Sequence, residues 1–430
     1  MNQISPNAQS NRALVISPML PPSSENDRGG MQRRVSLFLR AIARRFKRID
    51  LVHIVPSAML EGAPPDGSLD RAQSNFWGVP VHAYRVPRRI RAETLWNHYG
   101  AGILDASEQP ALRGYGGAAL ADAIDRHLSQ APGIVYVDRL EAMLPVLQAR
   151  SRISNLLLDL NDVEHKLRIG AIRPILSSAP NAAALLQLPA LIWAEFQAVR
   201  RSTIATVCSE VDRVHLRRLG FGPRITVVPN AVTVPSNPPG LVPAPTVLFL
   251  GACNYGPNFD AAERLARRIW PLVRAQVPHA RLVLAGKETD RLPSRAEGFA
   301  GVTYRGFVDN LACLYAETRL VCCPLIAGSG TRLKLVEAAG FARPMISTRI
   351  GAEGLDFTDG VDILLRESDQ AIADACIHLL RDDAACGRLG ANARATMTRL
   401  YDSDLIEAQI ENLVAAITRE EASPQPISVR

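Results

Sequence analysis

The sequence lacks the features of a secreted or membrane-spanning protein. Its seven cysteines include no C-x-x-C pair and none lies before Cys208, so we expect neither a disulfide framework nor a zinc or other metal site. No segment approaches the ~20 consecutive apolar residues that span a bilayer. The first apolar run, residues 13–16, is too short for a signal peptide. These absences predict a cytoplasmic protein, either soluble or peripheral to a membrane.

Aromatic residues are scarce and basic residues are unevenly placed. Residues 1–235 contain 28 Lys and Arg against 19 Asp and Glu, whereas residues 236–430 contain 21 against 23. The positive first half would attract anionic partners. Because no aromatic platform or nucleic-acid motif accompanies this charge, we do not expect a nucleic-acid partner.

Short apolar runs alternate with helical patterns along most of the 430 residues. Strands are predicted at residues 13–17, 49–55, 79–86, 134–137, 156–160, 204–208, 226–229, 246–250, 281–285, 302–304, 320–324 and 344–347. Helices are predicted at residues 31–46, 117–128, 260–276, 311–317, 333–340, 369–381 and 386–400, and in the long insertions 87–116 and 166–200. This alternation is typical of parallel sheets covered by helices on both faces.

A Pro-rich segment, residues 235–245, interrupts the alternation and is typical of an interdomain linker. We therefore predict two doubly wound, Rossmann-like α/β domains, residues 1–235 and 236–400, that face a central cleft. Residues 401–430 are predicted to form a helix that crosses back to the first domain, and a tail. In such sheets ligands bind at the carboxyl ends of the strands.

The most informative stretch follows the strand at residues 320–325. It is a loop of small residues, Ala327, Gly328, Ser329, Gly330 and Thr331. The helix that follows carries Arg332, Lys334 and Glu337. A glycine-rich loop at a helix N-terminus is suited to anions, and the two cations add positive charge there. The arrangement favours a nucleoside diphosphate, with Glu337 accepting from a ribose or sugar hydroxyl. Alternatively, the two cations only solvate a helix face.

Four segments together resemble the retaining GT-B glycosyltransferases of glycosyltransferase family 4, particularly those of bacterial surface-polysaccharide pathways. They are VCSEVDRVHLRRLGF followed by ITVVPNAV, LFLGACNYGPNFDAAERL, ARLVLAGK, and the stretch from VTYRGFVDN to RIGAEGL. The resemblance implies a GT-B fold and a nucleoside-diphosphate sugar donor held by the C-terminal domain. It also implies a glycan or lipid-linked acceptor, retention at the anomeric carbon, and no obligatory cofactor or metal.

The chain departs from the family pattern at two places. The pattern has two glutamates separated by seven residues; Glu337 matches the second, which contacts the ribose, but Ser329 stands at the first. The Arg and Lys that usually follow the first strand of the C-terminal domain are also missing, because residues 251–254 read GACN. Arg332 and Lys334 are therefore predicted to neutralise the departing diphosphate.

A glycine pair, Gly29 and Gly30, ends the loop after the first strand. The resemblance implies that this loop faces the donor phosphates, with Arg33 or Arg34 nearby, and glycine permits the close backbone approach that such a contact needs. The pair is equally consistent with an ordinary strand-to-helix turn.

Asn161 and Asp162 follow the predicted strand at residues 156–160. They occupy the place at which family members often carry a histidine near the acceptor. Asp162 is a candidate for receiving or orienting the proton of the acceptor hydroxyl. The alternative role for Asp162 is to cap the next helix.

Residues 33–48, RRVSLFLRAIARRFKR, form a basic helix with an apolar stripe. The stripe is either the core-facing side of an ordinary helix or part of a surface that meets anionic lipid. The second reading predicts a peripheral protein on the inner face of the plasma membrane.

These observations predict a glycosyltransferase of cell-surface polysaccharide biosynthesis. The alternatives are a nucleotide-sugar epimerase of GT-B-like fold and a non-catalytic nucleotide-sugar-binding protein.

Overall fold

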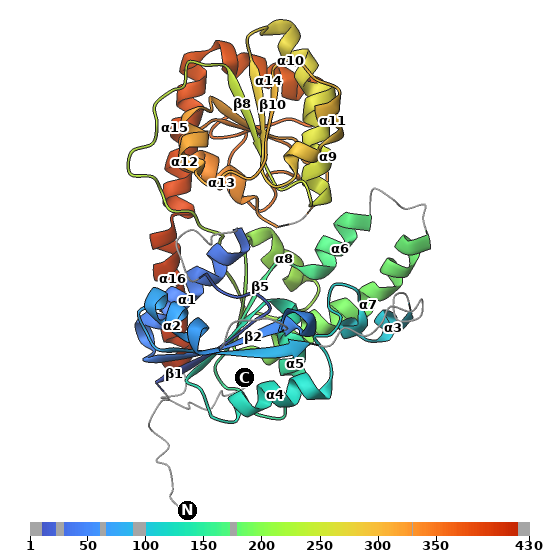
Figure 1. Ribbon diagram of the computed structural model, residues 1–430, viewed down its shortest axis with the longest axis vertical. Helices are drawn as coiled ribbons and strands as arrows, with labels where there is room; N and C mark the ends of the chain where they lie inside the picture. Colours follow the sequence, from blue (N-terminus) through green and yellow to red (C-terminus); the bar gives the residue numbers. More distant parts are fainter. Residues whose placement is uncertain are drawn as a thin grey trace, which may run out of the picture. The chain divides into compact units, whose positions relative to one another are not determined.

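The computed structural model describes residues 11–22, 30–60, 66–88, 100–172, 179–328 and 330–419, which form two compact units (Figure 1). Unit 1 comprises Met1–Val228 and Ile406–Arg430, and unit 2 comprises Pro229–Leu405. The Pro-rich segment 235–245 belongs to unit 2. Its backbone carbonyls accept hydrogen bonds from three arginines of that unit, Arg319, Arg343 and Arg394. This segment, which begins a few residues after the boundary between the two units, is therefore packed against unit 2.

Unit 1 is built on a seven-stranded sheet in the order β3-β2-β1-β4-β5-β6-β7, with every pair parallel. The strands are β1 Arg12–Ser17, β2 Arg48–Pro56, β3 Val81–Arg88, β4 Ile134–Asp138, β5 Leu156–Asn161, β6 Ile204–Val207 and β7 Ile225–Val227. The predicted strands of the first half are confirmed. These strands could be predicted from the sequence because strands buried on both faces are short and almost wholly apolar.

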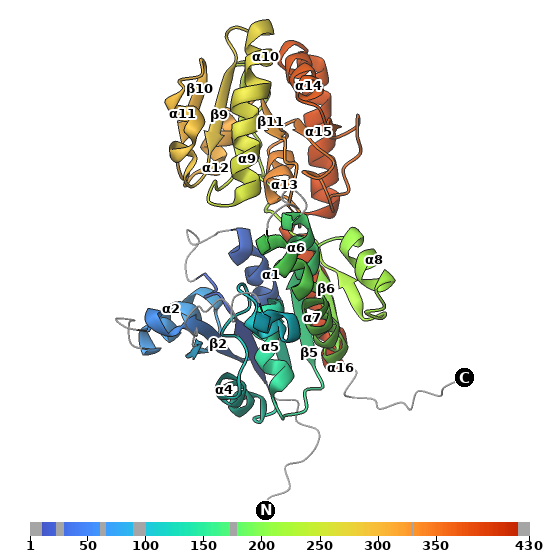
Figure 2. The same ribbon diagram turned by 90° about the vertical axis from the view of Figure 1, so that its right-hand side faces the viewer.

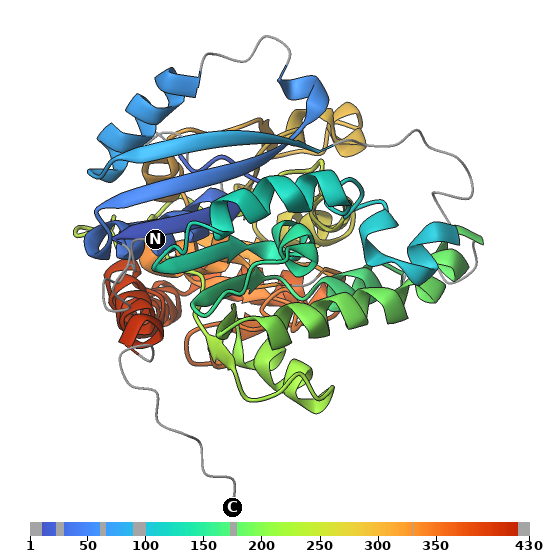
Figure 3. The ribbon, with the colours of Figure 1, turned by 90° about the horizontal axis from the view of Figure 1, so that it is seen from below.

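Helices cover both faces of this sheet. They are α1 Gly30–Arg45, α2 Asp66–Trp77, α3 Ala101–Leu104, α4 Ala118–Leu128, α5 Arg139–Gln148, α6 Glu164–Ile172, α7 Ala179–Arg201, α8 Glu210–Arg218 and α16 Ser403–Arg419, with short 3₁₀ turns at Ser57–Met59 and Ala106–Glu108. Helix α7 (green in Figure 3) packs against α5 and α6, and the short α3 lies beside it. The insertions at residues 87–116 and 166–200 thus contribute α3 and the α6–α7 pair.

The basic helix α1 packs against α16 through ion pairs and is largely committed within unit 1. Arg44 contacts Glu407 and Glu411, and the Arg45 Nε atom donates to the Thr418 hydroxyl at 3.0 Å. Its apolar residues, including Phe38 and Ile42, lie in the core. The core-facing reading of this helix therefore holds, and α1 gives little support to a lipid-binding role.

Unit 2 contains a six-stranded parallel sheet in the order β10-β9-β8-β11-β12-β13. The strands are β8 Thr246–Leu250, β9 Arg281–Ala285, β10 Val302–Arg305, β11 Leu320–Cys323, β12 Met345–Ser347 and β13 Leu364–Leu365. The helices are α9 Gly256–Arg264, α10 Trp270–Gln276, α11 Pro293–Ala296, α12 Leu311–Ala316, α13 Leu333–Gly340, α14 Asp369–Arg381 and α15 Asp383–Leu400, with a π turn at Leu265–Ile269 and a 3₁₀ turn at Thr289–Arg291. In Figure 2, α9 and α10 lie in front of this sheet.

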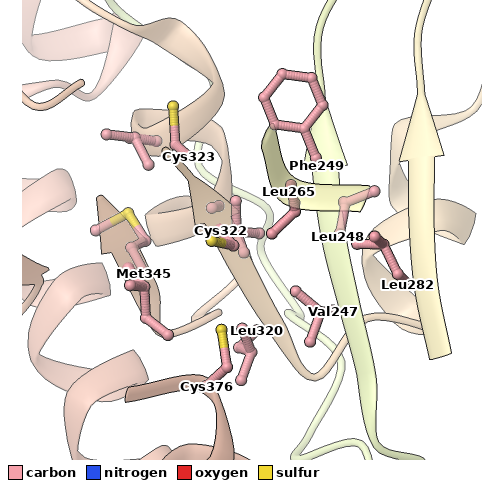
Figure 4. Packing of buried hydrophobic residues seen from close by; sticks show 14 of the residues in the cluster. Val247, Leu248, Phe249, Leu265, Leu282, Leu320, Cys322, Cys323, Met345 and Cys376 are labelled. Carbon is pink, nitrogen blue, oxygen red and sulfur yellow. The ribbon is translucent and has the colours of Figure 1, made fainter. Parts of the chain in front are cut away.

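The core of unit 2 lies between its sheet and the helices on either face (Figure 4). Val247, Leu248 and Phe249 of β8 are fully buried, as are Cys322 and Cys323 of β11. All seven cysteines are free thiols, and six are buried. The central position of β8 and β11 fixes the loops that follow them, and these loops carry the candidate site.

Candidate functional site

The site lies at one edge of the unit 2 sheet. Because all six strands are parallel, their carboxyl ends share an edge. Strands β8, β9 and β10 follow one another outward on one side of the sheet, and β11, β12 and β13 follow one another outward on the other side. The strand order therefore reverses between β8 and β11. In open parallel sheets this reversal point is where ligands bind.

Lys334 is the charged group at the reversal point. It is the second residue of α13, and its ammonium donates to the Asn258 side-chain oxygen at 2.7 Å. The same ammonium lies 4.6 Å from the centroid of the Phe249 ring. Burial lowers the pKa of Lys334 below its ordinary value. An ammonium has three N–H donors and Asn258 takes one, so Lys334 retains capacity for an anionic oxygen.

Asn258 connects Lys334 to the loop after β8. It lies in the first turn of α9, and its amide nitrogen donates to the Ala252 carbonyl at 3.0 Å. Gly251 lies beneath the pair: a Cβ at this position would come within 2.7 Å of the Lys334 nitrogen and 2.9 Å of Asn258 Cγ. The space that a side chain at residue 251 would fill is thus occupied by the ammonium of Lys334. This close approach accounts for glycine at residue 251.

Asn258→Ala should weaken the binding of the expected nucleoside diphosphate, with UDP as the probe, roughly tenfold, because Lys334 would lose the hydrogen bond that orients it. Asn258→Asp should also weaken binding, since a carboxylate beside the ammonium would compete with the ligand for its charge. Isothermal titration with UDP measures both effects. Equal UDP affinity in the wild type and Asn258→Ala would show that Lys334 needs no positioning.

Arg332 folds back over the glycine-rich loop. It is the residue before α13 and is buried, and its Nη1 atom donates to the Gly330 carbonyl at 2.6 Å. Gly328 has a φ of 109°, and a Cβ there would approach the Arg332 guanidinium to 2.8 Å and the Tyr255 hydroxyl to 3.2 Å. Glycine is therefore required at residue 328 both by the backbone angle and by the guanidinium.

The structure describes Thr331 and Glu337 among the remaining predicted residues of the loop and its helix. The Thr331 hydroxyl accepts from the Asn230 amide at 2.7 Å. Glu337 is buried one turn after Lys334 and interacts electrostatically with it. Ser329 lies outside the described residues. Arg332 and Lys334 therefore lie at the start of α13, and Glu337 lies about one turn further along the helix.

Two residues that sequence reasoning missed lie at the same edge. Lys287 follows β9 and Phe307 follows β10, and the Lys287 ammonium lies 5.7 Å from the centroid of the Phe307 ring. Phe307 is 66% exposed. Asn258 was also missed, although it stands in the quoted segment GACNYGPNFD. Its role depends on a contact with a residue 76 positions away.

Unit 1 has a second polar edge at the carboxyl ends of β4 and β5. Arg139, directly after β4, has a φ of 71°, and Asn161, the last residue of β5, has a φ of 59°. The Asn161 carbonyl accepts from the Cys208 thiol at 2.9 Å. Left-handed backbone at non-glycine residues is costly and is often found at functional sites. Asp162 follows Asn161 and lies in the field of Arg139.

The structure describes Gly30 and Arg34 from the predicted glycine loop and its arginines. Gly30 is the first residue of α1, and Gly29 lies outside the described residues. Arg34 is buried and bound to Asp159 at 2.6 and 2.7 Å, and it also donates to the Val228 carbonyl at 2.8 Å. The Arg34 guanidinium therefore joins strand β5 to the segment after β7, and the expectation that the glycine loop lies near donor phosphates stays a prediction.

A cluster of ionisable residues lies beside Asp162. His165 contacts Glu195 through Nδ1, and its Nε2 atom lies 2.7 Å from His215 Nε2. Both His165 and Glu195 are buried. Glu164 is next to them, and burial followed by the charges of Glu141 and Glu195 raises its pKa to about 8. Among the described residues, no three His, Cys, Asp or Glu side chains are arranged to hold a metal ion.

Glu164 should make unit 1 less stable as the pH rises. Its folded pKa of about 8 exceeds the unfolded value near 4.3, so the folded state retains a proton that the unfolded state loses between these pH values. Glu164→Gln should therefore match the wild type near pH 4 and exceed its free energy of unfolding by several kcal/mol above pH 8, at about 1.4 kcal/mol for each unit between the two pKa values. Thermal unfolding followed across this range measures the difference. If the stability of the two proteins changed equally with pH, the raised pKa of Glu164 would be contradicted.

Comparisons with known proteins agree with this geometry. The family model of glycosyl transferases group 1 matches residues 244–382, most of unit 2. An uncharacterized 44.6 kDa protein of the cps region of Klebsiella pneumoniae is 21% identical over 173 residues. That alignment covers 38% of this chain and 44% of the Klebsiella protein, less than half the length of either.

Solved structures match over nearly the whole chain. Sucrose-phosphate synthase from Thermosynechococcus elongatus is 16% identical with a TM-score of 0.63, covering 96% of this chain and 99% of the other. Anabaena HepE, crystallised with UDP and glucose, is 14% identical with a TM-score of 0.59, covering 95% and 100%. S. aureus TarM is 12% identical with a TM-score of 0.65, covering 96% and 100%. Two parallel-sheet α/β units and these similarities establish that the chain has the GT-B fold.

Proposed function

We propose that this protein is a glycosyltransferase that moves a sugar from a nucleoside-diphosphate donor to a glycan or lipid-linked acceptor in cell-surface polysaccharide biosynthesis. The observation that carries the proposal is the ammonium of Lys334, oriented by Asn258 at the reversal point of the unit 2 sheet. The match of residues 244–382 to group 1 glycosyl transferases supports it. The UDP and glucose bound to HepE support a nucleotide-sugar donor, and the cps-region relative supports a role in polysaccharide synthesis.

In the proposed reaction, the bond between the anomeric carbon and the diphosphate oxygen breaks, and the acceptor oxygen bonds to that carbon. Negative charge grows on the leaving diphosphate as the bond lengthens. Lys334, Arg332 and the N-terminus of α13 would stabilise this charge, and charge stabilisation in the transition state is what accelerates the reaction. Glu337 would bind the ribose. No metal is required by this scheme, because the cations come from side chains.

The acceptor side is assigned to unit 1. Asp162 is proposed to receive or orient the proton of the acceptor hydroxyl, supported by its place beside the left-handed Asn161 at the end of β5. Retention of configuration is part of the proposal, and its support is the resemblance of the sequence to family 4 enzymes. A lipid-linked acceptor would bring the enzyme to the cytoplasmic face of the plasma membrane.

The experiment has two steps. Thermal-shift measurements with UDP-, GDP- and ADP-sugars identify the base, and a labelled sugar from the stabilising donor is then offered to a lipid-linked saccharide extract. Incorporation of label into the lipid fraction supports the proposal. A new nucleotide sugar formed without acceptor would indicate an epimerase, and donor binding with neither transfer nor hydrolysis would indicate a non-catalytic binding protein.

A further inference from the structure

Helix α7 presents an exposed face without charge. Residues 179–199 contain a single charged side chain, Glu195, and that carboxylate is buried against His165. Leu186 and Trp193, two turns apart on this helix, are 59% and 60% exposed, and Leu185 is exposed beside them. The solvent-facing side of a helix is ordinarily charged or polar, so an apolar exposed face indicates a binding surface.

The apolar surface continues onto α3. Gln109, just beyond α3, donates to the Gly102 carbonyl of α3 at 3.0 Å and to the Gln187 carbonyl of α7 at 2.8 Å, so the two helices are fixed side by side (Figure 1). Leu104, the last residue of α3, is 86% exposed. A hollow of about 430 Å³ lies between α3, α5 and α7 and is lined by Leu104 and Trp193 among others. We call Leu104, Leu185, Leu186 and Trp193 the α7 patch.

Exposed arginines border the patch at the C-terminal end of α7. Arg200 lies 5.6 Å from the Phe196 ring, which stacks on Trp193. Arg201 donates to the carbonyls of Ala149 and Ser151, which fixes the turn carrying two more exposed arginines, Arg150 and Arg152, beside α7. The nearby carboxylate of Asp105 accepts from the Ser107 amide and so caps its own turn. Because this border is positively charged, a partner that binds it should be anionic.

We propose that the α7 patch and its arginine border bind the interface of an anionic lipid bilayer. Leucine and tryptophan side chains are suited to the boundary between headgroups and acyl chains, and arginines bind lipid phosphates. At about 1.5 Å per residue, α7 is long enough to lie along a membrane surface for more than 30 Å. No helix among the described residues is long and apolar enough to cross a membrane. The inference does not depend on sugar transfer.

Sedimentation with phosphatidylcholine vesicles, with and without phosphatidylglycerol, tests the proposal on the full-length chain. The wild type should bind the phosphatidylglycerol vesicles, more weakly at high salt, and should bind phosphatidylcholine alone poorly. Leu186→Ser with Trp193→Ser should weaken binding by at least roughly tenfold, because two large apolar groups are lost. Arg152→Gln with Arg200→Gln should weaken binding and flatten its salt dependence.

A matched control comes from the same unit. Met59 is 69% exposed and belongs to a different element, the turn after β2. Met59→Ser should leave vesicle binding unchanged. UDP affinity should stay at the wild-type value in every variant, which separates a failure of this inference from a failure of the proposed function.

Tryptophan fluorescence measures whether the side chain of Trp193 inserts into the bilayer. Lipids brominated on their acyl chains should quench the wild type, and Trp193→Phe should abolish most of that quenching while still binding. The proposal is overturned if the wild type ignores anionic vesicles at low salt, or if the serine pair binds them as well as the wild type does. It is also overturned if the protein is a dimer without lipid that the serine pair dissociates, because the patch then belongs to a second copy.

Discussion

Lys334→Ala should lower the catalytic efficiency of sugar transfer by about 10- to 100-fold, the largest effect expected from a single site residue. A charge-assisted hydrogen bond to a phosphate oxygen is worth about 1.5–3 kcal/mol, and the bond to Lys334 should strengthen as the diphosphate departs. Both kcat and the affinity for the donor should therefore fall. Steady-state kinetics with the donor identified by thermal shift provide the measurement.

The control for this result is another lysine of the same chain. Lys47 is exposed and belongs to unit 1, whereas the candidate diphosphate site belongs to unit 2. Lys47→Ala should therefore leave donor kinetics unchanged. Arg332→Ala should reproduce part of the Lys334 effect, since its guanidinium lies over the same loop. Unchanged donor kinetics in both Lys334→Ala and Arg332→Ala would remove the basis for a diphosphate site at α13.

Arg34→Met should destabilise the protein by about 3–5 kcal/mol, because it leaves the carboxylate of Asp159 buried without its cation. Asp159 is fully buried and is bound through both oxygens to Arg34, and it also accepts from the Thr206 hydroxyl at 2.7 Å. The midpoint of urea unfolding, followed by a probe in unit 1, measures the loss. Donor affinity should be retained, because Arg34 does not belong to the donor site.

A second ion pair of α1 gives the contrast. Arg44 is 62% exposed at its side chain and pairs with Glu407, and Arg44→Met should cost no more than about 1 kcal/mol. The double change Arg34→Met with Asp159→Asn should be less destabilising than the sum of the two single changes, since no unpaired charge is left buried. Additive effects would mean that the pair contributes no coupling.

The strands were predictable because each is a short apolar run buried on both faces, and the two-unit α/β architecture follows from their alternation with helices. Arg332, Lys334 and Glu337 were predictable because they share one helix start, so local spacing places them. Asn258 was not, since its contact with Lys334 depends on how two separate helices pack on one sheet. The pair of Arg34 and Asp159 was not predicted for the same reason, since the two residues are 125 positions apart and tertiary packing brings them together.

Two further features could not be predicted from the sequence. They are the π turn within the helix at residues 256–276 and the packing of the Pro-rich segment 235–245 onto unit 2. Proline and glycine content indicates irregular backbone but carries no information about which side chains bind its carbonyls. Arg319 and Arg343 do so from elements far along the chain. Composition therefore indicates an irregular segment and leaves its packing open.

The most direct test of the central claim, that unit 2 binds a nucleoside diphosphate through Lys334, is isothermal titration of UDP in the presence of EDTA. We predict one binding site that survives chelation and is weakened at least roughly tenfold in Lys334→Ala. If UDP does not bind, GDP and ADP take its place in the same titration. Equal affinity of the wild type and Lys334→Ala for the diphosphate that binds, or no binding of any of the three, would contradict the claim.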